Sequence, residues 1–186
     1  SEIYRNTPPP GLLEVCAQMG HRNYRQCLVF HSLSKRSNLP GLRSGFVAGD
    51  ASFIAPFLKY RTYHGCSMSM AVQKASELAW SDEDHVIVNR GLYAEKFQAA
   101  ADILDEQLDS HDPGAGFYLW AKTPTGCDTF SRDLYAATGV TVLPGQFLGR
   151  EVDGVNPGAG FVRMALVAEP DTCREALLRI QRFMTR

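Results

Sequence analysis

The spacing of apolar residues alternates along the chain between helical periodicity and short continuous runs. Helical periodicity predicts helices over 11–20, 53–58, 69–80, 86–108, 128–138 and 173–183. Short apolar runs predict strands at 27–30, 46–49, 117–120, 140–143 and 161–167. Short strands separated by helices are typical of an α/β protein, which is the fold class we predict.

Polar residues at two of the predicted helix starts support these boundaries. Ser81 and the acidic residues at 82–84 suit the start of the long helix over 86–108, because a hydroxyl and negative charge favour a helix N-terminus. Thr172 and Glu175 have the spacing of a capping box for the last helix.

The long helix divides the chain into two lobes. Residues 1–84 contain part of a sheet, 85–111 are predicted to form a connecting helix, and 112–186 contain strands and a closing helix of their own. We therefore predict a compact second domain that begins at about residue 112.

Composition narrows the class of protein. The chain has 186 residues, of which 45% are hydrophobic, so a substantial core is expected. Its formal net charge is −1 and it has no basic block. We therefore expect neither nucleic acid nor a membrane among its partners.

The cysteines are odd in number and scattered along the chain, at Cys16, Cys27, Cys66, Cys127 and Cys173. None belongs to a Cys-x-x-Cys pair, so we predict neither a disulfide framework nor a metal site. Free thiols favour a reducing compartment, and we expect a cytoplasmic protein.

The strongest chemical signal is Lys35. It follows the apolar run 27–30 and the hydroxyl residues Ser32 and Ser34, and Arg43 comes a short loop later between two glycines. A free lysine has a pKa of about 10.4, and burial at a strand end or a nearby cation lowers it toward a nucleophilic amine. An isolated Ser-x-Ser-Lys is typical of a surface loop, but the arginine that follows can bind phosphate oxygens. The pattern suits a lysine that forms an imine with an aldehyde cofactor.

Arg163 is a single cation within an apolar run, Phe161–Ala165. A buried arginine needs a partner, whereas an arginine on an edge strand can face the solvent. The residues alone favour the exposed position.

The segment from Ser32 to Gly45 resembles the cofactor-binding lysine segment of the class I and II (fold-type I) aminotransferases. The segments 116–120 and 142–149 resemble other parts of the same family, so the resemblance covers nearly the whole chain. It implies that the cofactor is pyridoxal 5'-phosphate. It also implies that 1–84 is the C-terminal part of the cofactor-binding large domain and 112–186 the small C-terminal domain.

The resemblance implies a role for each candidate residue. Lys35 would form the Schiff base with pyridoxal phosphate and later move a proton on the substrate. Ser32, Ser34 and Arg43 would bind the cofactor, with its phosphate held by Ser32 and Arg43. Arg163 would bind the α-carboxylate of the substrate through two hydrogen bonds, which a planar guanidinium favours. The substrates would be an amino acid and a 2-oxo acid, and the enzyme a homodimer.

Within the family, the loops at 8–12, 34–41 and 63–67 resemble those of bacterial N-succinyldiaminopimelate aminotransferases of lysine biosynthesis. This implies N-succinyl-diaminopimelate as amino donor and 2-oxoglutarate as acceptor. Two alternatives stay open. One is another pyridoxal-phosphate reaction on the same scaffold, by a carbon–sulfur lyase or a decarboxylase. The other is an aminotransferase-like sensor domain of a transcription regulator.

The first four residues match a motif of the family only in part. The family has an Asp-x-x-Tyr upstream of its lysine, and Ser1–Tyr4 matches only the tyrosine. We therefore expect the true motif to lie further upstream, in a longer protein of which this chain is the C-terminal half. The role of Tyr4 stays open, and we expect His64 to lie in a surface or interface loop.

Overall fold

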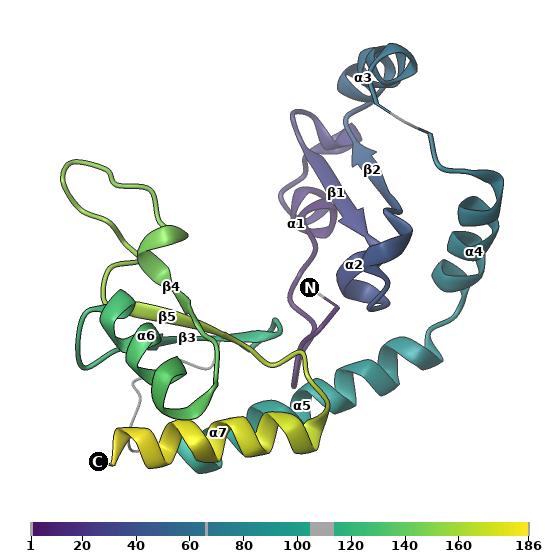
Figure 1. The fold of residues 1–186 in the computed structure, drawn as a ribbon. Helices are drawn as coiled ribbons and strands as arrows, with labels where there is room; N and C mark the ends of the chain where they lie inside the picture. The colour runs from purple at the N-terminus through teal and green to yellow at the C-terminus, as the bar shows by residue number, and fades with distance from the viewer. Residues whose placement is uncertain (1, 66, 105–113, 186) are drawn as a thin grey trace. The chain divides into compact units, whose positions relative to one another are not determined.

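The computed structural model describes residues 2–65, 67–104 and 114–185 (Figure 1). The chain divides into two compact units, Ser1–Arg90 and Gly91–Arg186. The point of division falls within the long helix α5, Asp84–Leu104. The predicted bounds at 84 and 111 remain a prediction, and the end of the predicted helix, from 105 to 108, lies outside the described residues.

The first unit is built on an antiparallel pair of strands, β1 (Leu28–Ser32) and β2 (Gly45–Gly49). Leu28 pairs with Gly49, and Ser32 pairs with Gly45. The strands approach closely at both ends, since a Cβ on Gly45 would lie 2.5 Å from the carbonyl oxygen of His31. Gly49 has a φ of 144°, which L-residues with side chains rarely adopt.

Along the chain, helices come before, between and after these two strands. They are α1 (Leu12–Gln18), α2 (Leu33–Arg36), α3 (Ala51–Tyr63) and α4 (Met70–Ser81), with 3₁₀ turns η1 (Arg22–Tyr24) and η2 (Pro40–Leu42). Asp50 caps α3, because its carboxylate accepts hydrogen bonds from the backbone N–H and the hydroxyl of Ser52 at 2.8 and 2.7 Å. Ser69 caps α4 in the same way.

The second unit is a three-stranded antiparallel sheet with helices. Its strands are β3 (Tyr118–Lys122), β4 (Leu143–Pro144) and β5 (Phe161–Ala165), in the order β3-β5-β4. The 3₁₀ turn η3 (Gly145–Phe147) follows β4, and the helices are α6 (Cys127–Thr138) and α7 (Pro170–Met184). One hydrophobic core joins the inner face of the sheet to α5, α6 and α7, with Ala121, Leu134 and Val162 completely buried.

The mixed helix and strand composition confirms the predicted fold class, but some boundaries were wrong. The strand predicted at 140–143 is reduced to Leu143–Pro144, because only these residues pair with β5. The strand predicted at 161–167 ends at Ala165. The capping box predicted at Thr172 is also wrong, because α7 begins earlier, with Pro170 in its first turn, a position that proline favours.

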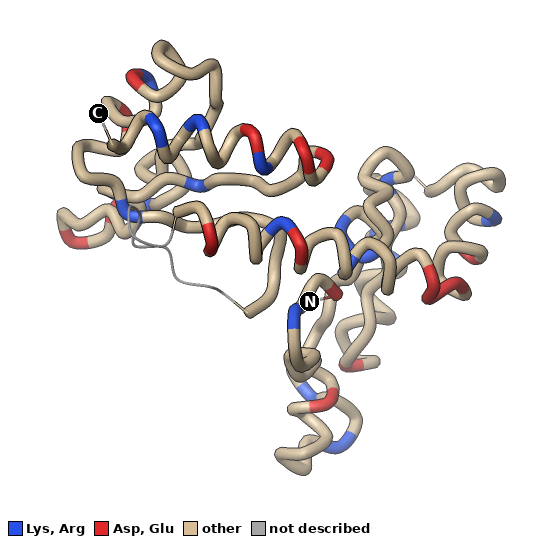
Figure 2. The backbone as a smooth tube through the Cα atoms, turned by 90° about the horizontal axis from the view of Figure 1, so that it is seen from below, with Lys and Arg blue, Asp and Glu red and all other residues tan. Residues whose placement is uncertain are grey.

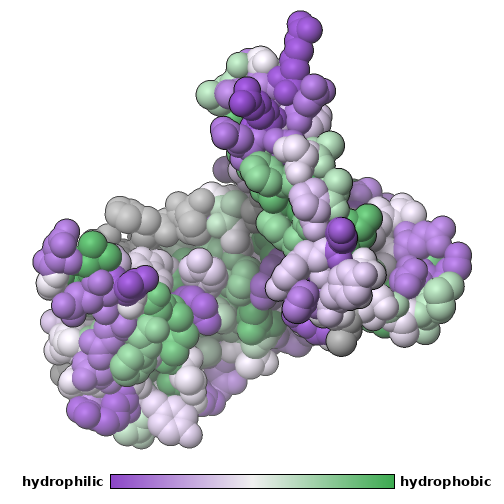
Figure 3. All heavy atoms as spheres, turned by 90° about the horizontal axis from the view of Figure 1, so that it is seen from above, coloured by the Kyte–Doolittle hydropathy of each residue, from purple (hydrophilic) through white to green (hydrophobic). Residues whose placement is uncertain are grey.

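The charges of α7 follow the helix dipole. Figure 2 shows acidic residues near the start of this helix and basic residues toward its end, and Asp171 and Arg182 occupy the first and last turns. Each unit also exposes large apolar side chains, among them Phe30 and Phe147, both 69% exposed. Figure 3 shows apolar side chains (green) reaching the surface among hydrophilic ones. Within the described ranges, no helix combines the length and apolar character that a membrane span requires.

Candidate active site

A single loop carries most of the predicted site. Residues 33–44 connect β1 to β2 and contain both α2 and η2. The two ends of this loop meet, because Ser32 pairs with Gly45 and the Leu33 backbone N–H donates to the Ser44 carbonyl at 3.1 Å. Lys35 and Arg43 therefore lie on one closed loop at one end of the strand pair.

The two serines form a connected pair at the start of α2. Ser32 is the N-cap residue, and its Oγ accepts a hydrogen bond from the Ser34 backbone N–H at 3.0 Å. The two hydroxyl oxygens are 2.8 Å apart and hydrogen-bonded to each other. The arrangement holds two hydroxyl groups beside the lysine.

Lys35 lies in the one-turn helix α2, just beyond the end of β1, and its side chain is exposed. The sequence predicted a buried amine at the end of a strand, whereas the side chain of Lys35 is exposed in the described chain. The side chain of Lys35 is thus accessible from the surface of its own unit.

Arg43 is exposed and has a φ of 51°, in the left-handed region that favours glycine. Its Nη1 donates to the Pro40 carbonyl at 2.9 Å. This bond folds the guanidinium back over η2. Among the described residues no other hydrogen bond engages this guanidinium, so its remaining N–H groups can donate to an anion.

The sequence analysis missed the buried neighbours of these residues. Arg36 and Ser44, which follow Lys35 and Arg43 in the sequence, are each 3% exposed. Ser44 Oγ lies 2.7 Å from the hydroxyl of Ser76 on α4, which is also buried. The signal that could have revealed Arg36 is its i,i+3 spacing from the apolar Leu33, which places both on one side of a helical turn.

Two carboxylates of the first unit have lowered pKa values: Asp50, at the end of the strand pair opposite this loop, and Asp82, whose carbonyl accepts from Arg36. The backbone N–H of Gln26, at 2.8 Å, and the donors of Ser52 hold the pKa of Asp50 below its ordinary value. A hydrogen bond with His85, at 2.7 Å, is the main cause of a lowered pKa at Asp82, in the turn between α4 and α5. Both carboxylates already serve as structural acceptors.

Arg163 belongs to the second unit, at the centre of its sheet. It lies on β5 between Trp120 on β3 and Leu143 on β4, so it is not on an edge strand. It is half-buried, and its guanidinium carbon lies 5.6 Å from the centre of the Tyr118 ring. Alternation along β5 turns Val162 to the core and Arg163 to the opposite face. No ion pair within the described ranges involves Arg163.

The two residues left open take part in aromatic contacts. The guanidinium carbon of Arg90 lies 4.0 Å from the centre of the Tyr4 ring. His64 follows the end of α3, where its ring stacks on Tyr60 at 4.4 Å. Neither contact indicates a catalytic role.

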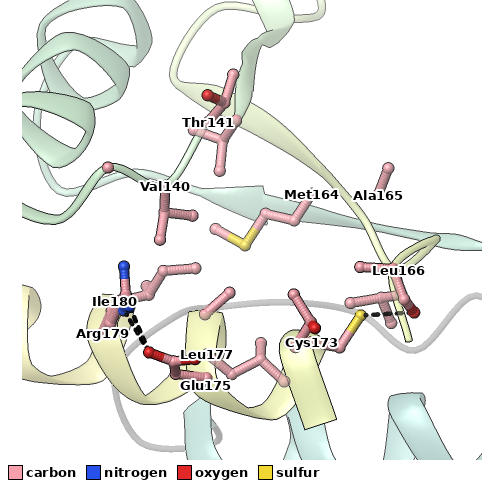
Figure 4. Close-up of a pocket in the computed structure, with 15 residues that line it drawn as sticks. Val140, Thr141, Met164, Ala165, Leu166, Cys173, Glu175, Leu177, Arg179 and Ile180 are labelled. Atoms are coloured by element: carbon pink, nitrogen blue, oxygen red, sulfur yellow. Dashed lines mark hydrogen bonds and ion pairs between the residues drawn. The ribbon is translucent and has the colours of Figure 1, made fainter. Parts of the chain in front are cut away.

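A cavity of about 330 Å³ lies in the second unit, between residues 139–142, the end of β5 and α7. Figure 4 shows Val140 and Met164 facing Leu177 and Ile180 across this cavity, with the Arg179–Glu175 ion pair at its side. None of the predicted site residues lines it. The cavity lies on the side of the sheet that faces the hydrophobic core, and Arg163 lies on the other side.

Comparison with known proteins gives the family of the chain. The family model for aminotransferase class I and II matches residues 2–180. An LL-diaminopimelate aminotransferase from Nitratidesulfovibrio vulgaris (strain DSM 19637 / Miyazaki F) is 33% identical over 97% of this chain and 45% of its own length.

Solved structures are similar over the same extent. The crystal structure of an aminotransferase from Neisseria meningitidis Z2491 superposes with a TM-score of 0.93 at 52% identity, covering 99% of this chain and 47% of that one. A probable N-succinyldiaminopimelate aminotransferase from Thermus thermophilus has a TM-score of 0.82 at 26% identity, covering 97% and 47%. The chain thus spans about half the length of the relatives it matches.

Proposed function

The chain belongs to the class I and II aminotransferase family, and from this we propose that the whole protein transfers an amino group by means of pyridoxal phosphate bonded to Lys35. The observation that carries the proposal is the closed loop 33–44, which holds Lys35 and Arg43 at one end of the strand pair, beside the linked hydroxyls of Ser32 and Ser34. The family in general depends on this cofactor.

The residues of this loop fit the cofactor chemically. When bound, pyridoxal phosphate supplies an aldehyde that bonds an amine and a ring that takes up electrons. The exposed Lys35 supplies the amine. Ser32, Ser34 and Arg43 supply hydroxyl and guanidinium donors for the phosphate, and charge-assisted bonds of this kind are among the strongest hydrogen bonds in proteins. As a free amine, Lys35 would accept and return the proton at the substrate Cα.

Arg163 is proposed to bind the α-carboxylate of the substrate. In the second unit its guanidinium has the Tyr118 ring nearby and no carboxylate partner within the described ranges. A planar guanidinium on a rigid central strand can accept a carboxylate through two parallel hydrogen bonds.

We propose N-succinyl-diaminopimelate as the amino donor and 2-oxoglutarate as the acceptor. The proposal is supported by the loops at 8–12, 34–41 and 63–67, and by similarity to relatives named for diaminopimelate or its succinyl derivative. The succinyl group converts the distal amine to an amide and adds a carboxylate, so the two possible donors differ in charge. We further propose a cytoplasmic homodimer, on the family resemblance.

Borohydride reduction of the cofactor-loaded whole protein, followed by peptide mapping, tests the role of Lys35. The label is expected on Lys35, to be lost in Lys35→Ala and retained in Lys59→Ala, a matched exposed lysine on α3. A label on any other lysine contradicts the proposal.

A panel of amino donors with 2-oxoglutarate tests the reaction and the substrate. We expect the highest kcat/KM with N-succinyl-diaminopimelate. A clear preference for free LL-diaminopimelate, aspartate, alanine or an aromatic amino acid would show that the proposed donor is wrong. Elimination or decarboxylation without amino transfer would instead identify a lyase or a decarboxylase.

A further inference from the structure

The helix that carries Lys35 is too short to hold its own position. α2 contains only Leu33–Arg36, a single turn, and an isolated turn of helix is unstable in water. Its two faces differ sharply. Leu33 is 0% exposed and Arg36 is 3% exposed, whereas Lys35 is exposed. The orientation of Lys35 therefore depends on what fixes the buried face.

Arg36 makes a set of polar contacts with the end of α4 and the turn that follows it. Its Nη1 donates to the Ala79 carbonyl at 2.7 Å, and its Nη2 donates to the Asp82 carbonyl at 3.4 Å. Nη2 also forms an ion pair with the carboxylate of Glu83. The carbonyls at the end of a helix have no partner within the helix, and here one guanidinium supplies donors to this region.

The Trp80 ring forms a platform beneath this guanidinium. The guanidinium carbon of Arg36 lies 5.1 Å from the ring centre. The same ring contacts His31 on β1 and Phe46 on β2, with centroid distances of 5.4 and 5.1 Å. Arg36 thus connects the short helix both to α4 and to the strand pair from which the loop emerges.

We propose that Arg36 is a positioning residue for Lys35, fixing the one-turn helix against α4 so that the amine projects at a set angle from the loop. This rests on the proposed function, since it concerns the lysine assigned to the cofactor. Arg36 touches neither substrate nor cofactor in this role. It acts through the backbone that it shares with Lys35.

Only an arginine satisfies these contacts together. A guanidinium offers five donors in a planar fork and stacks on an aromatic face. A lysine in its place retains the charge, but a compact ammonium cannot lie over the Trp80 ring while donating to both Ala79 and Glu83. Arg36→Lys should therefore restore part of the effect of Arg36→Met.

The test uses the cofactor-loaded whole protein and the variants Arg36→Met and Arg36→Lys. Arg179→Met is the matched control, because Arg179 also pairs with a carboxylate and donates to a carbonyl, in the second unit. The first readout is the pH midpoint at which the absorbance of the bound cofactor changes without substrate. The second is hydrogen exchange of residues 33–39 in the cofactor-free protein. The third is the urea midpoint.

A displaced Lys35 changes the hydrogen bonds around the proton it shares with the cofactor. We expect the pH midpoint to move by about one unit in Arg36→Met, since altered hydrogen bonding shifts a pKa. We expect a smaller shift in Arg36→Lys and none in Arg179→Met. Exchange should accelerate at the amides of Ser37 and Leu39, which are bonded to the Leu33 carbonyl.

Each outcome supports or overturns the proposal that Arg36 positions Lys35. A wild-type midpoint in a folded Arg36→Met overturns the proposal, even if the urea midpoint falls, because a purely structural role lowers stability alone. If Arg36→Met does not fold, Glu83→Gln takes its place, and an unchanged midpoint there also overturns it. A borohydride label away from Lys35 in the wild type would refute the proposed function. A label on Lys35 with unchanged midpoints in the variants would refute this inference alone.

Discussion

Replacing Arg163 by alanine tests whether the second unit takes part in substrate binding. The guanidinium lies at the centre of the three-stranded sheet, on the face opposite the core, and no ion pair within the described ranges engages it. Its loss should therefore leave folding nearly intact. We expect the free energy of unfolding to change by less than about 1 kcal/mol, the range of strand propensity differences.

The effect on binding should be larger. Removing one partner of a desolvated charge pair costs about 2–5 kcal/mol. Arg163 is only half-buried in this chain, so solvent screens the pair and the lower end of this range applies. About 2 kcal/mol corresponds to roughly a 30-fold loss of kcat/KM. The loss should be similar for the amino donor and for the oxo acid, because both present an α-carboxylate.

The assay compares Arg163→Ala, Arg163→Lys and Lys122→Ala in steady-state kinetics with both substrates. Lys122 is a suitable control, because it is an exposed cation on β3 that alternation places on the same face of the sheet. Arg163→Lys should recover part of the activity, since it keeps the charge and loses the two-point geometry. Unchanged kinetics for both substrates in Arg163→Ala, or an equal loss in Lys122→Ala, would refute the assignment.

Three further predictions concern stability and thiol reactivity. Leu134→Ala, at a completely buried position, should lower the free energy of unfolding in urea by about 2–5 kcal/mol, and a loss below about 1 kcal/mol would contradict its place in the core. Because the Gln26 backbone N–H lowers the pKa of Asp50, this carboxylate stabilises the fold above its unfolded pKa, and the contribution is lost as pH falls through the lower folded value. Urea midpoints of wild type and Asp50→Asn should therefore converge in acid, and a constant difference would contradict this. Iodoacetamide should alkylate Cys27 before Cys16, as followed by mass spectrometry. Cys16 is 3% exposed, and its hydrogen bond to Cys27, at 3.0 Å, raises the pKa of the Cys16 thiol. Equal alkylation rates for the two cysteines would contradict this prediction.

Helical spacing and short apolar runs predicted most elements of the fold. The strands β1, β2, β3 and β5 and the helices α4 and α6 lie close to the predicted ranges. The two wrong strand boundaries have a common physical cause. Residues 140–142 have the alternation of a strand, but a strand also needs a partner with free backbone groups, and β5 pairs only from Leu143 onward. Pairing is a tertiary property that local spacing does not contain.

The sequence predicts the residue types of the candidate site, but not the buried contacts that support them. The hydroxyl, amine and guanidinium groups at Ser32, Lys35 and Arg43 indicated cofactor chemistry because few arrangements bring such groups together. Arg36 gave no signal of cofactor chemistry, and a cation beside a lysine is typical of a solvated surface; only its i,i+3 spacing from Leu33 indicated a buried side. Its burial follows from Trp80 and Ala79, which are far away in sequence and reach it only through the fold.

The structure relates each proposed functional residue to a buried neighbour in the sequence. Exposed Lys35 precedes buried Arg36, exposed Arg43 precedes buried Ser44, and half-buried Arg163 lies next to completely buried Val162. This follows from geometry, because adjacent side chains diverge on a helix and point to opposite faces on a strand.

Both anchors of the loop end on one face of α4. Ser44 is bonded to Ser76. Arg36 donates to the Ala79 carbonyl and lies over the Trp80 ring, and these two residues follow Ser76 by three and four positions along the helix. Since α4 is a continuous helix of 12 residues, it fixes the separation of the two anchors. We therefore expect α4, which contributes no group to the proposed chemistry, to help set the separation of Lys35 and Arg43 on the loop.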